Sequence, residues 1–120
     1  MMRIMAKGKL HRATITDANL LYEGSLTVDP QLMELADLLP HERVQVVNIN
    51  NGFRGETYVI PGRSGSGVIC ANGALARHAE IGDKVIIISY GWMEDAEARS
   101  LVPRFILLDE QNRPILRSVA

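Results

Sequence analysis

The sequence predicts a mainly β fold, a small β-barrel or compact sheet with short helices, in a single domain over residues 1–120. Three observations support this prediction. A chain of 120 residues can bury one core without help from a disulfide or a metal. Several short strand-like runs have only short helices inserted between them, which favours such a fold over a parallel α/β arrangement. No repeat, linker or low-complexity tract indicates a second domain.

Two strands are predicted in the first part of the chain. Residues 3–16 alternate loosely between apolar and polar side chains, as a half-buried strand does. Residues 22–28, YEGSLTV, form the next strand, although Gly24 offers no side chain to pack and marks a bulge, a bend or a close backbone approach. The Gly-Ser pair is either punctuation or a place where the Ser25 hydroxyl attacks the preceding carbonyl carbon, in a strained geometry that glycine permits.

A short amphipathic helix is predicted between 29 and 40. Asp29 is the expected N-cap, Pro30 takes the first helical position, and Pro40 ends the helix. Between them, leucines at positions 32, 35, 38 and 39 are expected on one face.

Residues 43–60 carry the strongest local signal. Two strand-like runs flank Asn51-Gly52, a pair that readily adopts the positive φ angles of a two-residue hairpin turn. The sequence therefore predicts an antiparallel hairpin here.

The second half of the chain continues the pattern of short elements. The predicted elements are a loop over 61–67, a strand over 68–73, a helical turn over 74–79, a buried strand over 83–90, a helix over 93–101 and a last strand over 104–110. The tail after that strand is expected to be frayed.

Composition excludes several function classes. Thirteen basic and fourteen acidic residues give a formal charge of −1 without any run of like charges, so we expect no nucleic-acid or anionic-membrane partner. The single cysteine, Cys70, lies between apolar neighbours and is expected to be buried and inert, as fits an intracellular protein. Residues 1–12 are too densely charged for a signal peptide, and no segment is long enough to span a membrane. A soluble cytoplasmic protein is predicted.

The loop over 61–67, PGRSGSG, resembles two catalytic motifs only in part. Gly62 and Gly67 have the spacing of a phosphate-binding loop, but Val68-Ile69 replace the Lys and Ser/Thr that the phosphates and metal require. Ser66 replaces the second glycine of a serine-hydrolase elbow. A flexible connector is the preferred interpretation.

Other polar residues carry weak signals when taken singly. The histidines at 11, 41 and 78 are far apart in sequence, so no metal site is predicted, and the acids of MEDAEAR indicate a solvated helix face. Lys9 and His11 lie two apart and share one face of their strand, while Arg54 is close to Thr57 and Tyr58 in the hairpin's second strand. Residue types alone lead no further than a small β-rich domain.

The segments GKLHRATIT, YEGSLTVD, NNGFRGETYVIPG, GSGVICANGA and GDKVIIISY, in this order and spacing, resemble the aspartate 1-decarboxylase family. The resemblance runs from the first residues to about position 107. It implies a carboxy-lyase with a covalent pyruvoyl cofactor and no metal, which makes β-alanine from L-aspartate for pantothenate synthesis. It also implies a double-psi β-barrel and a homotetramer with active sites between neighbouring subunits. Whether a maturation accessory protein is needed stays open.

The resemblance also assigns roles to individual residues. The precursor would cleave itself between Gly24 and Ser25 into a β chain, 1–24, and an α chain, 25–120, and Ser25 would become the pyruvoyl group that forms a Schiff base with the substrate amine. Strain at Gly24 and a hydrogen bond from Thr57 to the oxyanion would lower the barrier to cleavage. Tyr58 would donate the proton that replaces carbon dioxide.

The remaining site residues follow from the same resemblance. Arg54 and Lys9 would bind substrate carboxylates. The other positions expected to line the site or lie near it are Asn72, Gly73, Ala74, Leu75, Tyr22 and His11. Two positions depart from the family's pattern: Val47 stands where some members have tryptophan, and Leu75 stands where alanine is common and is expected to reshape the pocket.

Two other hypotheses remain open at this stage. The chain is also compatible with a non-catalytic β-barrel that binds a protein or DNA, although its near-neutral charge weighs against DNA. A third alternative is an unprocessed, inactive member of the family, in which replacing Ser25 would change nothing.

Overall fold

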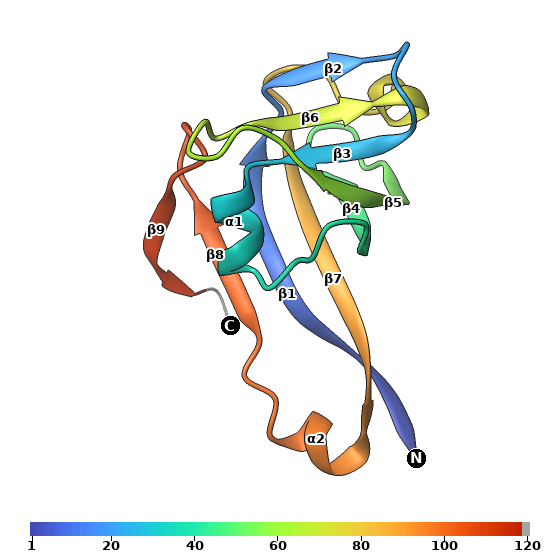
Figure 1. Ribbon diagram of the computed structural model, residues 1–120, viewed down its shortest axis with the longest axis vertical. Helices are drawn as coiled ribbons and strands as arrows, with labels where there is room; N and C mark the ends of the chain where they lie inside the picture. The colour runs from blue at the N-terminus through green and yellow to red at the C-terminus, as the bar shows by residue number, and fades with distance from the viewer. Residues whose placement is uncertain (119–120) are drawn as a thin grey trace.

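The computed structural model describes residues 1–118, with side chains through residue 115. It is mainly β, which confirms the predicted fold class. One nine-stranded sheet has the order β2-β6-β3-β5-β4-β7-β1-β8-β9 (Figure 1). The strands are β1 (Met2–Thr14), β2 (Asp17–Asn19), β3 (Ser25–Val28), β4 (Arg43–Asn48), β5 (Arg54–Pro61), β6 (Ile69–Asn72), β7 (Lys84–Glu94), β8 (Arg104–Leu108) and β9 (Pro114–Ser118). The helices are α1 (Pro30–Leu35), the 3-10 helix η1 (Gly73–Arg77) and α2 (Asp95–Arg99).

The sheet mixes strand directions in a way that brings distant segments together. Parallel pairs join β1 to β8, β2 to β6 and β3 to β5, and the other neighbours are antiparallel. The long strands β1 and β7 extend beyond the rest of the sheet as a ribbon that carries α2 at its tip (Figure 1). This mixed, strongly curved sheet is consistent with a β-barrel, while the double-psi connection stays a prediction.

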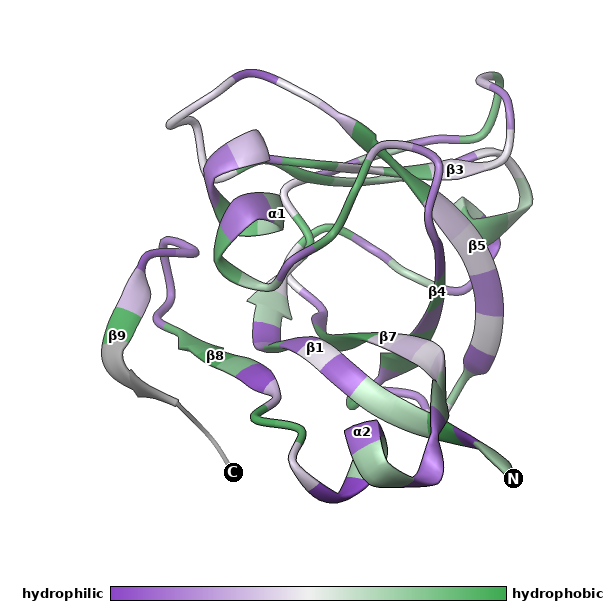
Figure 2. Cartoon of the chain, turned by 60° about the horizontal axis from the view of Figure 1, so that its bottom comes forward, coloured by the Kyte–Doolittle hydropathy of each residue, from purple (hydrophilic) through white to green (hydrophobic). Residues whose placement is uncertain are grey.

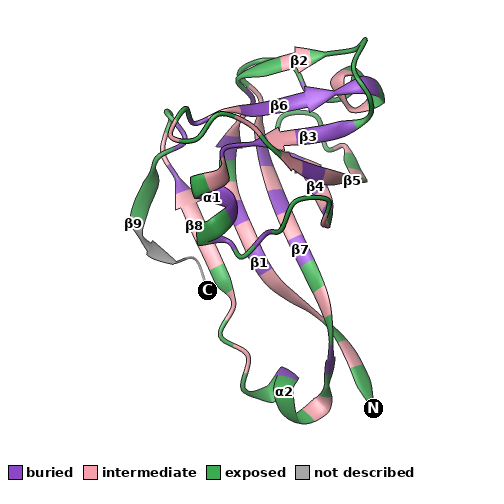
Figure 3. Cartoon of the chain, viewed as in Figure 1, coloured by how far each residue is buried: buried purple, intermediate pink, exposed green. Residues whose placement is uncertain are grey.

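The hydrophobic core lies between α1 and the upper part of the sheet, where β3 and β6 are almost wholly buried (Figure 3). Its fully buried side chains include Leu10, Ile15, Leu26, Val28, Val44, Val46, Val59, Ile69, Val85 and Ile87. Gly8 lets β1 approach the end of α1, because a Cβ at this position would lie 2.0 Å from the carbonyl oxygen of Ala36. The core thereby fixes β3 and β6, the two strands that carry the candidate site.

Helix α1 begins as predicted but ends early. The Asp29 side chain accepts a hydrogen bond from the Gln31 N–H at 2.9 Å, and Pro30 is the first helical residue. Asp37 has a φ of 58°, and the N–H groups of Asp37 and Leu38 donate to Glu34 and Met33, which is a Schellman ending. The leucines therefore do not share one face: those at 32 and 38 are buried, whereas those at 35 and 39 are exposed. Figure 2 shows apolar and polar residues side by side along this short helix.

The predicted hairpin is present with a longer turn than expected. Strands β4 and β5 pair antiparallel, from Arg43 opposite Tyr58 to Val47 opposite Arg54. The turn has four residues, 49–52, because the Asn48 N–H donates to the Phe53 carbonyl and only Gly52 of the Asn-Gly pair has a positive φ, 78°. The Asn48 side chain binds the turn at the Asn50 N–H and so favours the longer connection.

The strand predicted over 22–28 is shorter than expected. It begins only at Ser25, and the chain turns between the edge strand β2 and β3. The predicted break at Gly24 therefore marks the start of the strand and not a bulge within it. Four further predictions, the strand near 68–73, the turn near 74–79, the strand near 83–90 and the helix near 93–101, correspond to β6, η1, β7 and α2.

The end of the chain is better ordered than the sequence suggested. Strand β8 is not the last, because β9 pairs antiparallel with it. The turn between them is anchored by Asn112, whose buried side chain accepts from the Thr14 N–H and donates to the carbonyls of Thr14 and Gly67. The prediction of a frayed tail is therefore wrong through residue 118, and residues 119–120 lie outside the described part.

The loop over 61–67 is attached to the body of the protein by Asp29. One carboxylate oxygen of Asp29 accepts from the Gly65 N–H at 3.0 Å and the other from the Gly67 N–H at 2.9 Å. The Arg113 guanidinium donates to the Gly65 carbonyl at 3.0 Å. Interpreted from sequence as a flexible connector, this segment is instead held at several points.

Candidate active site

The first residue of β3, Ser25, is buried despite its polar side chain, with 1% of its surface exposed. Its Oγ donates to the Glu23 carbonyl at 3.1 Å and accepts from Asn72 Nδ2 at 3.1 Å. Burial of a hydroxyl is tolerated because both of its hydrogen-bonding roles are satisfied. The hydroxyl is thus held beside the peptide bond that joins it to Gly24.

The side chain of Asn72 organises the polar groups beneath this peptide bond. Asn72 lies opposite Ser25 in the antiparallel pairing of β6 with β3. Its Nδ2 donates both to Ser25 Oγ and to Thr27 Oγ1, the latter at 2.9 Å, and its Oδ1 accepts from Cys70 Sγ at 3.2 Å. Because the Asn72 amide is held by three hydrogen bonds, its NH₂ group is a fixed donor to Ser25 Oγ.

Gly73 packs directly against the backbone of Gly24. A Cβ at Gly73 would lie 2.8 Å from both the Cα and the N of Gly24, and 3.0 Å from the Tyr22 carbonyl oxygen. Gly73 also has a φ of 65°, a conformation that side chains rarely adopt. Gly24 itself is not left-handed, and a Cβ there would meet no atom within 4 Å. The expected strain at Gly24 therefore takes no form of positive φ, and the glycine that the structure constrains is its neighbour Gly73.

Two hollows adjoin the Gly24–Ser25 pair, one lined by Gly24 and the other by Ser25. Their volumes are about 510 and 520 Å³, and the Tyr58 side chain lines both. The first is lined by Gly24, Phe53, Glu56, Thr57, Tyr58, Ala74, Leu75 and His78. The second is lined by Tyr22, Glu23, Ser25, His41, Tyr58 and Ile60. The structure therefore brings together nine of the twelve residues proposed from sequence, counting the buried Asn72 and Gly73.

The three remaining residues, Lys9, His11 and Arg54, line neither hollow. Lys9 Nζ lies 4.5 Å from the centre of the Phe105 ring, and Arg54 is exposed at the start of β5. His11 Nδ1 is buried and has no hydrogen-bond partner within the described residues, and burial, with Lys9 and Arg12, lowers the pKa of this side chain. These three groups lie on β1 and β5 and contribute to neither hollow beside Gly24 and Ser25 of their own chain.

Sequence reasoning missed several residues that line the hollows. His41 is exposed, as a surface or partly packed histidine would be, and it also lines the hollow beside Ser25, with a left-handed φ of 73° and its ring 6.2 Å from that of Tyr58. Phe53 and His78 stack at 4.2 Å and close the other hollow. No local pattern predicts these contacts, because each residue follows a turn whose path depends on the whole sheet.

The described residues contain no group of three or more His, Cys, Asp or Glu side chains placed to hold a metal ion. Within the same residues, no helix has the length and apolar character needed to cross a membrane. Fold and site together define a mainly β domain in which the buried Ser25 lines one hollow and the preceding Gly24 lines another.

Comparison with known proteins identifies the family. The sequence model of the family described as aspartate decarboxylase matches residues 1–115, which extends the resemblance beyond residue 107. Aspartate 1-decarboxylase of Thermoanaerobacter pseudethanolicus is 58% identical over 96% of this chain and 98% of its own length. Aspartate 1-decarboxylase of Heliobacterium modesticaldum is 63% identical over 96% of this chain and 87% of its own length, and that of Listeria monocytogenes is 58% identical over 93% and 88%. The chain belongs to the aspartate decarboxylase family.

Proposed function

We propose that the chain is an aspartate 1-decarboxylase that makes its own pyruvoyl group by cutting the bond between Gly24 and Ser25. Membership of the family supports the reaction, and the observation that carries the cleavage site is the position of the Ser25 hydroxyl. Its Oγ adjoins the preceding carbonyl, accepts a hydrogen bond from Asn72 and lies at a hollow that Tyr58 also lines.

The proposed cleavage begins with an attack by Ser25 Oγ on the Gly24 carbonyl carbon. The C–O bond forms, the C–N bond breaks, and the hydroxyl proton moves to the Ser25 nitrogen, so the peptide becomes an ester with a free amine. Thr57, which lines the same hollow as Gly24, would donate to the carbonyl oxygen as it becomes negative. The Asn72 amide would stabilise Ser25 Oγ as the hydroxyl gives up its proton.

The ester is then resolved by elimination. Loss of the Ser25 α-proton breaks the Cβ–Oγ bond, releases the carboxylate of Gly24 and leaves dehydroalanine. One water converts the dehydroalanine to a pyruvoyl group and ammonia. The products would be a β chain of residues 1–24 and an α chain of residues 25–120.

The residues present fit a pyruvoyl group at position 25. Ser25 lines a hollow of about 520 Å³, and Asn72, whose Nδ2 donates to Ser25 Oγ before cleavage, places a polar N–H group beside this position. When formed, the group supplies a ketone that accepts the electrons released as a carboxylate leaves as carbon dioxide. Tyr58, placed at both hollows, would donate the proton that replaces that carboxylate.

The cations that would bind the substrate come from a neighbouring subunit in this proposal. L-Aspartate carries two carboxylates, whereas Arg54 and Lys9 lie outside the hollows around Ser25. A homotetramer with sites between subunits would bring these side chains, and His11, to the serine of the next chain. Bidentate binding by the Arg54 guanidinium would fix the orientation of the substrate.

The place of the reaction in metabolism follows from the product. β-Alanine would be supplied to pantothenate synthesis, and we propose a cytoplasmic location for the enzyme. The need for an accessory maturation protein is an experimental question that the cleavage assay below answers, since the purified chain either processes itself or requires an added lysate fraction.

The test is an intact-mass measurement of the purified chain during prolonged incubation, together with an assay for β-alanine from L-aspartate. We expect two fragments that correspond to residues 1–24 and 25–120, the larger one with a pyruvoyl N-terminus, and β-alanine formation that rises with cleavage. Ser25→Ala should abolish both. A wild-type chain that stays intact and makes no β-alanine, even with lysate added, would contradict the proposal.

A further inference from the structure

The cysteine that sequence reasoning described as inert contacts the side chain that holds Ser25. Cys70 and Asn72 lie two residues apart on β6 and therefore share one face of this strand. The pairing of β6 with β3 places Ser25 opposite Asn72, and Thr27 opposite Cys70. Four polar side chains thus form a compact group under the bond between Gly24 and Ser25.

Each polar atom of Asn72 has a partner in this group. Nδ2 donates to the two hydroxyls, Ser25 Oγ at 3.1 Å and Thr27 Oγ1 at 2.9 Å, and Oδ1 accepts from the Cys70 thiol at 3.2 Å. Because Asn72 is only 3% exposed, water does not compete for these positions. The thiol is the only donor to Oδ1 among the hydrogen bonds of the described residues.

The two hydroxyls orient the amide only weakly. A hydroxyl can both donate and accept, so Thr27 would pair with an oxygen as well as with an NH₂ group, and Ser25 favours the NH₂ group only while its own proton goes to the Glu23 carbonyl. The Cys70 thiol, which donates to the amide oxygen at 3.2 Å, adds a second contact that favours the same orientation. Cys70 therefore helps to turn the NH₂ group toward Ser25.

We propose that Cys70 is a positioning residue for self-cleavage, whose thiol holds the Asn72 amide in the orientation that donates to Ser25 Oγ. The inference rests on the proposed function, because it assigns a role in the cleavage of the bond between Gly24 and Ser25. With the amide reversed, its oxygen would face Oγ and destabilise the negative charge that Oγ carries as the hydroxyl loses its proton before the attack.

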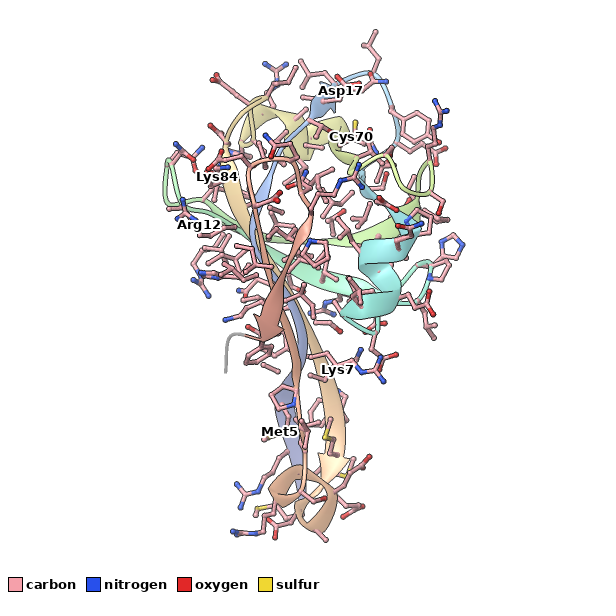
Figure 4. All side chains as sticks on the ribbon, turned by 90° about the vertical axis from the view of Figure 1, so that its left-hand side faces the viewer. Met5, Lys7, Arg12, Asp17, Cys70 and Lys84 are labelled. Carbon is pink, nitrogen blue, oxygen red and sulfur yellow. The ribbon has the colours of Figure 1, made fainter. Side chains whose placement is uncertain are left out.

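The surroundings of Cys70 keep the thiol in its donating form. Burial raises the pKa of Cys70, and the Asp17 carboxylate, opposite it on β2, raises the pKa further. Figure 4 shows Asp17 and Cys70 at the same end of the molecule, far from Lys7 and Met5 on the β1 ribbon. The protonated thiol, not the thiolate, is thus the species that contacts Asn72.

The test compares first-order rates of self-cleavage, measured by intact mass from freshly purified precursor. We expect Cys70→Ala to slow cleavage by about three- to tenfold, the effect of one net hydrogen bond, and Cys70→Ser, which keeps a donor, to remain within about twofold of wild type. Ser89→Ala is the matched control, since it removes a buried donor to Glu42 elsewhere in the sheet and should leave the rate unchanged. If Cys70→Ala does not fold, Cys70→Val fills the space without a donor.

A double-mutant cycle separates positioning from general loosening of the structure. If Cys70 acts only through Asn72, Cys70→Ala should have no further effect on the rate in an Asn72→Ala background. Additive losses, or a Cys70→Ala rate equal to wild type, would overturn the inference while leaving the proposed function intact. A wild-type chain that never cleaves would overturn both.

Discussion

The chain contains the dipeptide Gly-Ser twice, and the two copies differ in everything except their composition. At residues 24 and 25 the serine is buried, and its Oγ accepts from a side chain of another strand. At residues 65 and 66 the serine is exposed, and its Oγ donates to the Arg63 carbonyl at 2.6 Å and accepts from the Val68 N–H at 3.1 Å. Both hydrogen bonds of the Ser66 hydroxyl are thus made within its own turn.

The glycines differ in the opposite sense. Gly65 is left-handed, with a φ of 78°, and its N–H and carbonyl are held by Asp29 and Arg113. Gly24 has neither a positive φ nor a neighbour that a Cβ would meet. A positive φ and a hydrogen-bonded glycine carbonyl, which are both present at Gly65, therefore do not identify the proposed cleavage site at Gly24. The features that distinguish it are a hollow beside each of its two residues and a hydrogen-bond donor, Asn72, from β6.

The largest test of this contrast is Gly73→Ala. The new Cβ would overlap the Gly24 backbone at 2.8 Å, and displacement of a reacting group by about 1 Å costs on the order of 100-fold in rate, so we expect cleavage to slow by about that factor. The measurement is the half-time of cleavage by intact mass. Gly82→Ala is the control, because Gly82 is also left-handed, with a φ of 93°, but has no atom within 4 Å of its Cβ position. Equal rates in the two variants would contradict the prediction.

A second test releases the loop that holds Gly65 and Ser66. Asp29→Asn, made in the uncleavable Ser25→Ala background, should lower the free energy of unfolding at pH 7 by about 1–3 kcal/mol, since it weakens the cap of α1 and two bonds to the loop. Urea denaturation measures this loss, and Asp37→Asn at an exposed position is the control. Intact-mass measurement should show that the bond between Gly65 and Ser66 is not cleaved, whether or not the loop is released.

The pH dependence of the same variant has a definite sign. Burial alone would raise the pKa of Asp29, but hydrogen bonds from the N–H groups of Gly67, Gln31 and Gly65, together with Arg113, hold this pKa below its usual value. Such a carboxylate stabilises the fold above its ordinary pKa of 3.8, and the stabilisation is lost as the pH falls through the lower folded value. The unfolding free energy should therefore fall in acid more steeply for Ser25→Ala alone than with Asp29→Asn added. Parallel curves would refute this assignment.

A smaller effect is expected from Thr27→Val. The change removes one of the two acceptors of the Asn72 NH₂ group and leaves the bond to Ser25 Oγ in place, so cleavage should slow by about threefold. Thr27→Ser restores the hydroxyl and should restore the rate. A slowing that serine does not rescue would indicate that the methyl group, and not the hydrogen bond, matters.

The smallest expected effect is that of Ser66→Ala, which should leave fragment masses and cleavage rate unchanged. A new fragment boundary or a slower rate would break the contrast between the two dipeptides. Comparison of Ser66→Ala with Ser25→Ala tests whether the Gly-Ser dipeptide itself or the residues around it determine where the chain is cleaved.

Local sequence predicted those features of the fold that local physics controls. The N-cap at Asp29 is confirmed because the contact is made within two residues, and the hairpin from 43 to 60 is confirmed because its strands alternate in polarity. The early end of α1 was not predicted, because the residues at this end contact β1, which is distant in sequence. Lys7 Nζ donates to the Asp37 carbonyl, and Gly8 lies close to the Ala36 carbonyl. The ordered turn at Asn112 was missed for the same reason: its partners lie at Thr14 and Gly67.

The candidate site shows the same division. Residue patterns alone raised Ser25 only as one of two equivalent dipeptides, and the family resemblance supplied the partners far along the chain. The structure adds contacts that neither source gave, such as the close approach of Gly73 to Gly24 and the bond from Cys70 to Asn72. Such contacts depend on the register of β3 against β6, which no segment of the sequence specifies by itself.

The position of β1 in the sheet has a consequence for the folding of the mature protein. β1 lies between β7 and β8, yet it belongs to the residues that precede Ser25. After the proposed cut, the ladder from β1 to its two neighbours would hold two separate polypeptides together. A precursor chain can refold its own sheet in a unimolecular step, before any subunits assemble. Refolding of the processed form would first require an encounter between the peptide 1–24 and an incomplete sheet, so recovery of even one subunit would depend on concentration and would fail on dilution.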